Sequence, residues 1–259
     1  MIAGASFRAS SGEIPALRKS PGEFGGAPIP PGLLKHADEQ TVVGLVAVLR
    51  AVVEGGLDPS GFGAWAVLAA PRYFGRAAFL RAFPQYRDEG AWGVSPHLIP
   101  AHSLHSLSGT ISQVLKAHGT NLGVGGAPGG EREALLLAAT LLGEGATPAA
   151  WVVLTGRPPG LDRPDDEAGP GDYEALAVAL ACPSAGRQGL RLQIGPDSVA
   201  LIGGLAGDRE AVSAWLAPGS TRLDPGHDLR LAGPRPHSRP SPSPSPSRAG
   251  TAGETRGQS

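Results

Sequence analysis

The sequence is poor in the residues and patterns that mark several large classes of protein. It holds one cysteine, Cys182, so no disulfide forms within the chain and no zinc site is built from cysteines. The 22 Lys and Arg residues balance 23 Asp and Glu, which disfavours a nucleic acid or an anionic membrane as a partner. The longest apolar runs, 42–53 and 134–142, are shorter than the roughly 20 residues that cross a bilayer. We therefore expect a soluble, cytoplasmic protein without a secretory signal.

What the sequence does contain is distributed unevenly. Its 39 glycines and 26 prolines are about a quarter of the 259 residues, yet 41% of the residues are hydrophobic, which is enough for a packed interior. Residues 1–32, rich in Gly, Pro and Ser, predict a loose N-terminal arm. Residues 33–231 predict the folded domain. Residues 232–259 contain no large apolar side chain, and they predict a disordered Pro/Ser-rich tail.

Hydrophobic periodicity inside the domain predicts alternating helices and strands. Helices are expected at 41–53, 77–83, 104–116, 131–142 and 209–216, and strands at 63–70, 121–124, 151–155, 173–181, 190–194 and 198–202. This alternation indicates an α/β fold with layers around a largely parallel sheet. The segment 131–142 is apolar on nearly every side, which predicts a helix buried between layers.

The strongest local signal is the block 95–145, in which a helix, the dipeptide Gly119-Thr120, a short strand and a glycine-rich turn lead into the apolar helix. This block resembles the stretch of the β-ketoacyl synthases, in the thiolase-like superfamily, that carries the nucleophile elbow. In an ungapped alignment, 122–124 is the strand that precedes the elbow, and Ala127-Pro128-Gly129-Gly130 stands where the family has Ala-Cys-Ser-Ser. The resemblance implies a thiolase-like half, a layered mixed sheet with a buried central helix, over about 33–205.

Two departures from the family pattern limit the activity that the resemblance implies. Pro128 occupies the position of the catalytic cysteine and has neither a thiol nor a hydroxyl, so the acyl-enzyme step has no nucleophile there. The family's catalytic histidines belong to its carboxyl-terminal half, and this chain passes into its Pro/Ser tail where that half would start. We therefore expect no catalytic residue at the elbow, no cofactor and no metal. Enzymatic activity is left open.

The elbow residues themselves allow two interpretations. They are Gly125, Gly126, Ala127, Pro128, Gly129 and Gly130. Proline fits the first turn of a helix, so the bend is compatible with Pro128. The glycines permit close backbone approach and positive φ, and main-chain N–H groups there would accept an anion or a carbonyl oxygen in a residual pocket. The alternative is plain tight packing of the turn.

Other chemically capable side chains have simpler explanations. The histidines His97, His102, His105 and His118 have no cysteine or carboxylate beside them in the sequence, so capping and polar packing are favoured over a metal site. The serines at 103, 106, 108 and 112 do not form the G-x-S-x-G motif of hydrolases. Cys182 follows an apolar run and precedes Pro183, as expected of a structural thiol at a strand end.

The leading hypothesis is a β-ketoacyl synthase-like accessory or degenerate subunit, without condensing activity, in fatty-acid or polyketide-type acyl chemistry. A lone half would expose apolar surface, so we expect association with itself or with a catalytic ketosynthase subunit, and an acyl carrier protein as a further partner. The interface candidates are Leu104, Leu107, Ile111 and Leu115. Two alternatives stay open: an acyl transferase or thioester hydrolase that uses no cysteine, and a scaffold whose Pro/Ser tail recruits a partner.

Overall fold

A mixed five-stranded sheet forms the centre of the molecule. The computed structural model describes residues 2–126, 130–156 and 172–182 of the chain. In the sheet, whose order is β1-β7-β6-β4-β5, the strands are β1 (Ala3–Ser10), β4 (Ala66–Pro71), β5 (Asn121–Gly123), β6 (Ala149–Gly156) and β7 (Asp172–Ala181). Strands β5, β4 and β6 are parallel, whereas β7 runs antiparallel to both of its neighbours. The predicted α/β fold class with a layered mixed sheet is confirmed.

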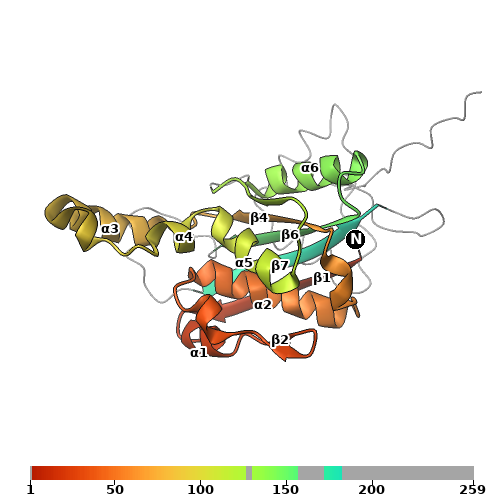
Figure 1. Cartoon of the computed structure of the whole chain (residues 1–259), viewed down its shortest axis with the longest axis horizontal. Helices are drawn as coiled ribbons and strands as arrows, with labels where there is room; N and C mark the ends of the chain where they lie inside the picture. Colours follow the sequence, from red (N-terminus) through yellow and green to blue (C-terminus); the bar gives the residue numbers. More distant parts are fainter. Residues whose placement is uncertain (1, 127–129, 157–171, 183–259) are drawn as a thin grey trace, which may run out of the picture.

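Helices cover both faces of this sheet (Figure 1). Helices α2 (Glu39–Glu54) and α5 (His105–Leu115) lie on one face, and α6 (Gly130–Gly143) lies on the other. Alternate strand residues divide between the two faces: Val67 and Ala69 of β4 pack toward α2 and α5, while Leu68 packs toward α6. Because both faces are covered, the central strands are apolar over most of their length, as the run at 63–70 predicted for β4.

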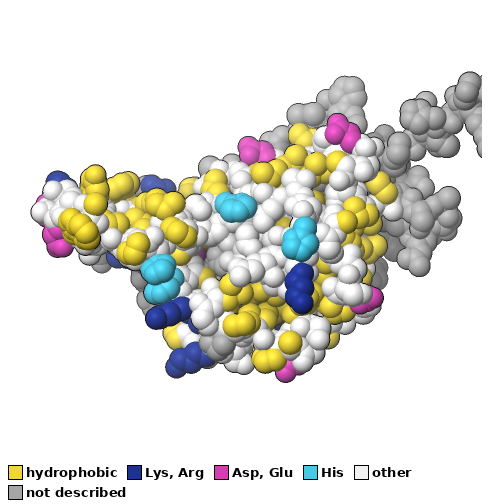
Figure 2. All heavy atoms as spheres, viewed as in Figure 1, with side chains coloured by type: hydrophobic (Ala, Val, Ile, Leu, Met, Phe, Trp, Pro, Cys, Tyr) yellow, Lys and Arg dark blue, Asp and Glu magenta, His cyan; other side chains and the backbone are white. Residues whose placement is uncertain are grey.

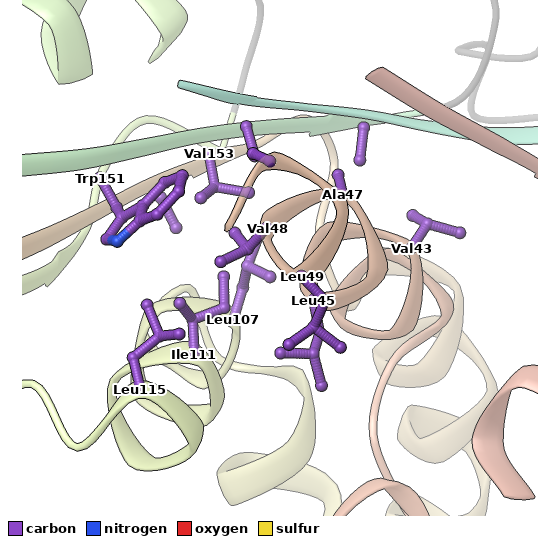
Figure 3. Packing of buried hydrophobic residues seen from close by; sticks show 14 of the residues in the cluster. Val43, Leu45, Ala47, Val48, Leu49, Leu107, Ile111, Leu115, Trp151 and Val153 are labelled. Carbon is purple, nitrogen blue, oxygen red and sulfur yellow. The ribbon is translucent and has the colours of Figure 1, made fainter. Parts of the chain in front are cut away.

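Helix α2 is the most deeply buried helix of the described chain. The side chain of Asp38 caps it, since one carboxylate oxygen accepts a hydrogen bond from the N–H of Gln40 at 2.9 Å. Val42, Leu45 and Val48 are fully buried, and Figure 3 shows this helix packed against Val153, Leu107 and Ile111. A wide apolar stripe of this kind is what the sequence pattern predicted for 41–53.

Helix α6 is covered on one side by the sheet. Ala134, Ala138 and Leu142 are buried against β4 and β6. Leu136, on the outer side of the helix, is 46% exposed. The sequence predicted a helix that is buried on both sides. In the described part of the chain, the sheet covers the inner side of α6 and no second apolar layer covers its outer side.

The N-terminal segment differs from the loose arm that its composition predicted. Strand β1 pairs with β7 over its whole length, from Ala3 opposite Ala179 to Ser10 opposite Asp172. The segment continues through α1 (Ile14–Lys19), the hairpin of β2 (Glu23–Phe24) and β3 (Ala27–Pro28), and the 3₁₀ turn η1 (Pro31–Leu34). The signal was missed because three of the inward positions of β1, Ala3, Ala5 and Ala9, are alanines, which are weak indicators of a strand although they fit closely beneath α2.

A helical arm projects from the body between β4 and α5 (Figure 1). It consists of α3 (Arg76–Glu89), the 3₁₀ turn η3 (Gly90–Gly93) and α4 (Leu98–His102). The arm begins at a sharp bend in which Tyr73 and Gly75 both have positive φ, 54° and 68°. Hydrophobic side chains gather on its surface (Figure 2), and its exposed large residues are Leu80, Phe83, Tyr86, Trp92 and Ile99.

The predicted interface stripe does not lie on the surface. Leu107, Ile111 and Leu115 are at most 1% exposed and pack against α2 and the sheet (Figure 3). Leu104 is partly buried against the same core. Leu107, Ile111 and Leu115 are therefore not available to a partner. The sequence pattern showed an apolar face without showing that α2 of the same chain covers it.

Several expectations lie outside the described residues. They are the strands at 190–194 and 198–202, the helix at 209–216 and the tail at 232–259. Among the described residues, no helix is both long enough and apolar enough to cross a membrane.

Candidate functional site

Polar groups gather where the parallel strands β4 and β6 end. The chain leaves β4 through Arg72 and Tyr73, and β6 ends near Thr155. The N-termini of α2 and α6 meet the same edge of the sheet, because each helix runs antiparallel to the strands that it covers (Figure 1). This carboxyl edge is where open α/β sheets usually bind ligands.

The glycine-rich turn forms one wall of this region. It joins β5 to α6, so the predicted order of strand, turn and helix is confirmed for the residues on either side of 127–129. Gly125 and Gly126 have φ of 78° and 92°, in the region that favours glycine. An ideal Cβ on Gly125 would lie 2.4 Å from the Cα of Gly130, and one on Gly123 would lie 2.0 Å from the carbonyl oxygen of Leu104. Gly123 and Gly125 are thus used for close packing of the chain on itself.

Arg72 and Glu131 form an ion pair that joins β4 to the first turn of α6. The guanidinium Nη2 of Arg72 donates to Oε1 of Glu131 at 2.9 Å, and both side chains are 11% exposed. The carboxylate also lies at a helix N-terminus, where the peptide dipoles favour negative charge. The N–H of Tyr73 donates to the carbonyl oxygen of Gly126 at 3.0 Å. Two contacts therefore tie the turn to the end of β4.

A buried amide connects the two strand ends with α2. Gln40 donates from Nε2 to the carbonyl oxygen of Arg72, and its Oε1 accepts from Oγ1 of Thr155, both at 2.9 Å. Gln40 and Thr155 are 4% and 1% exposed. Both ends of the Gln40 amide and the hydroxyl of Thr155 thus have hydrogen-bond partners. The network therefore fixes the positions of β4, β6 and α2 without leaving these polar groups buried and unpaired.

Asp38 and His102 form a second charged contact at this edge. Nδ1 of His102, at the end of α4, lies 3.1 Å from Oδ2 of Asp38, and the side chains are 20% and 9% exposed. The backbone of His102 is held tightly as well, because an ideal Cβ on Gly75 would lie 2.2 Å from its carbonyl oxygen. The pair joins the helical arm to the start of α2.

The imidazoles of His36 and His97 stack on each other, with ring centroids 4.1 Å apart and an interplanar angle of 5°. Partial desolvation lowers the pKa of His36 below its ordinary value of 6.5, and the positive charges of His97, Lys35 and Arg18 lower it further. The lowered pKa favours the neutral form of His36, which reduces the repulsion between the stacked rings.

The structure places the remaining candidates away from any shared site. Ser108 is buried and donates to the carbonyl oxygen of His105 at 3.1 Å, and Ser112 donates to that of Ala117 at 2.6 Å. Both hydroxyls hydrogen-bond to backbone carbonyl oxygens of α5 or of the residues that follow it, which agrees with the capping and packing roles expected from the sequence. Cys182 is exposed at the end of β7, where its Sγ lies 3.0 Å from the carbonyl oxygen of Leu142. Ala127, Pro128 and Gly129 lie outside the described residues.

Sequence reasoning missed the polar network and the His102 contact with Asp38. The partners are far apart in the chain, with separations of 59 residues for Arg72 and Glu131 and 64 for Asp38 and His102. The one available signal was Asp38, which precedes the apolar run of α2 as a capping residue does. Nothing in the local pattern indicates which side chain its second oxygen meets.

The similarities found between this chain and known proteins are similarities of fold. No protein-family model and no curated protein matches the chain. The chain is similar to a β-ketoacyl synthase from Burkholderia phymatum, at 15% identity and a TM-score of 0.48, over 70% of this chain and 59% of that one. It is also similar to a ketosynthase in complex with its chain length factor from Xenorhabdus doucetiae, at 14% identity and a TM-score of 0.47, over 80% and 92%.

A further similar structure is a type II polyketide synthase acyl-carrier protein in complex with its ketosynthase bound to a hexaketide. Identity is 16% and the TM-score is 0.45, over 68% of this chain and 62% of that one. The chain thus spans less than two thirds of this structure and of the Burkholderia enzyme. All three are ketosynthase structures, the family that the block 95–145 resembles.

Proposed function

We propose that this protein is a ketosynthase-like accessory subunit that does not itself condense acyl chains. The observation that carries the proposal is the proline at 128, between a strand and a helix that form the expected junction. A carbon–carbon condensation through an acyl-enzyme needs a thiol or hydroxyl at the bend, and proline offers neither. The substrates of the complex would be acyl thioesters of the fatty-acid or polyketide type.

Association is part of the proposal. The described chain exposes Phe83 and Trp92 on its arm, at 63% and 99%, and Leu136 on α6. Exposed apolar side chains that gather on one element are typical of a binding surface. We propose a second copy or a catalytic ketosynthase subunit as the partner, with an acyl carrier protein delivering the acyl group.

The position of residue 128 is tested by restoring the thiol. In a Cys182→Ser background, Pro128→Cys is compared with the matched control Leu136→Cys, which places a thiol on the exposed middle of α6. A thiolate at a helix N-terminus has a lowered pKa, so we expect Pro128→Cys to react with iodoacetamide at pH 7 at least about 10-fold faster than the control. Equal rates would show that residue 128 does not occupy a nucleophile position.

The absence of condensing activity is tested with Pro128 left in place. The Cys182→Ser chain is incubated with acyl and malonyl thioesters of coenzyme A, and intact-protein mass spectrometry and product analysis follow. We expect no acyl adduct on the protein and no carbon–carbon product. A condensed product from this chain alone would overturn the proposal. Complex formation with an intact ketosynthase of the same organism, measured by light scattering, is the positive counterpart.

A further inference from the structure

The contact between Asp38 and His102 has the geometry of an imidazole positioned by a carboxylate. Oδ2 of Asp38 faces Nδ1 of His102 at 3.1 Å, while Oδ1 accepts from the N–H of Gln40 at 2.9 Å. With 6% of Asp38 exposed, both carboxylate oxygens have defined partners and the carboxylate cannot turn away from the ring. A carboxylate in this place keeps the imidazole proton on Nδ1.

The second ring nitrogen of His102 is then a proton acceptor. Within the described part of the chain, Nε2 makes no hydrogen bond, and 20% of the side chain is exposed to solvent. A neutral imidazole with one nitrogen bound to a carboxylate and the other open to solvent is the usual form of a general base.

The surroundings favour water as the nucleophile. Ser103 and Ser106 share a hydrogen bond of 3.1 Å between their hydroxyls, and the hydroxyl of Ser106 donates to the carbonyl oxygen of Pro100 at 2.6 Å. These serines are therefore engaged with their own segment. Farther along this segment, Leu104 packs on Gly126, since an ideal Cβ there would lie 3.1 Å from its side chain. The residue two positions after His102 therefore contacts the glycine turn.

We propose that His102, positioned by Asp38, acts as the general base for hydrolysis of an acyl thioester. A water molecule gives a proton to Nε2 as its oxygen bonds to the acyl carbon. The carbon–sulfur bond then breaks, and the thiolate takes the proton from the imidazolium. The products are a carboxylic acid and a thiol. The choice of a thioester as substrate rests on the proposed function, while the base and its positioning residue rest on the geometry.

The full-length Cys182→Ser chain is tested with acetyl and hexanoyl coenzyme A, and release of the thiol is measured. General-base catalysis contributes about 10²–10⁴-fold, so we expect His102→Gln to reduce kcat/KM by at least 100-fold. Asp38→Asn retains an oxygen that caps α2, and we expect a smaller loss. The matched control is His105→Gln, which changes an exposed histidine on α5 and should leave the rate unchanged.

The pH profile and chemical rescue distinguish a general-base role of His102 from a purely structural role. In the parent chain, kcat/KM should rise with pH and then level off, as a rate that needs an unprotonated base does, and His102→Gln should remove this rise. Added imidazole should restore part of the rate to His102→Ala and should not affect the parent. Melting curves establish that each variant is folded.

Two outcomes would overturn the inference. One is thiol release by the parent chain no faster than in buffer, and the other is a His102→Gln rate equal to that of the parent. Neither result bears on the proposed accessory function, which fails if the chain alone yields a carbon–carbon product.

Discussion

At the scale of single residues, buried polar side chains hold the carboxyl edge of the sheet together. Gln40 uses both ends of its amide, one toward β4 and one toward β6. Arg72 connects the end of β4 with Glu131 at the start of α6. The arrangement depends on each partner being present, because a buried polar atom left alone costs more than a hydrogen bond returns.

Thr155→Val tests this dependence. Valine keeps the shape of the side chain and removes the hydroxyl that donates to Oε1 of Gln40, so we expect a loss of about 1–3 kcal/mol in the free energy of unfolding. Urea denaturation measures the loss. The control is Thr140→Val on α6, where the hydroxyl is exposed, and its effect should stay within about 0.5 kcal/mol. Equal losses for the two variants would contradict the role given to Gln40.

At the scale of elements, the approach of α2 to its neighbours depends on one position without a side chain. An ideal Cβ on Gly44 would lie 2.7 Å from Cδ1 of Leu107 and 3.1 Å from Cγ2 of Thr155. Helix α2 therefore fits between α5 and the sheet because residue 44 is glycine. This accounts for a glycine inside a helix, where it otherwise costs stability.

Gly44→Val should destabilise the protein through overpacking, by about 1–3 kcal/mol. The same change at Gly143 is the matched control, because an ideal Cβ at the end of α6 meets nothing within 4 Å. Thermal and urea unfolding of both variants provide the comparison. A Gly44→Val protein as stable as the Gly143→Val protein would show that the helices can move apart without cost.

At the scale of the whole molecule, the projecting arm carries the exposed apolar surface at which we expect association with other proteins. Of its large side chains, Trp92 is 99% exposed and Phe83 is 63% exposed. The arm is joined to the body by the bend at Tyr73 and Gly75 and by the contact of His102 with Asp38. This exposed surface replaces the stripe at Leu104–Leu115 as the place where association is expected.

We predict that the full chain self-associates at micromolar concentration, unless its catalytic partner is present. Light scattering coupled to size-exclusion chromatography should give at least twice the mass of one chain. Replacing Phe83 and Trp92 by serine should lower this mass toward that of a single chain, because exposed apolar area drives association. Val53→Ser is the control, since Val53 is 76% exposed outside the arm. A parent protein that elutes as a clean monomer would contradict the prediction.

Local patterns were sufficient for the principal helices and for the strand, turn and helix around the glycines. The periodicity of 41–53 predicted α2, and the short apolar runs predicted β4 and β6. An element that buries one face or both needs apolar residues at regular positions, and this pattern can be read from the sequence. The local pattern failed for β1, whose alanines carry little signal. It predicted the helix α5 correctly, but it did not show that α2 of the same chain covers the apolar face of α5.

The candidate site depends on the tertiary structure for a different reason. Asp38 and His102 are separated by 64 residues, and Arg72 and Glu131 by 59, so their meeting follows from how the arm returns to α2 and how α6 lies on β4. That Pro128 takes the place of the resembled family's cysteine is a prediction from the sequence, and residue 128 lies outside the described residues. Which charged groups gather at the carboxyl edge of the sheet follows from the packing of layers, since side-chain contacts between distant segments leave no periodic trace in the chain.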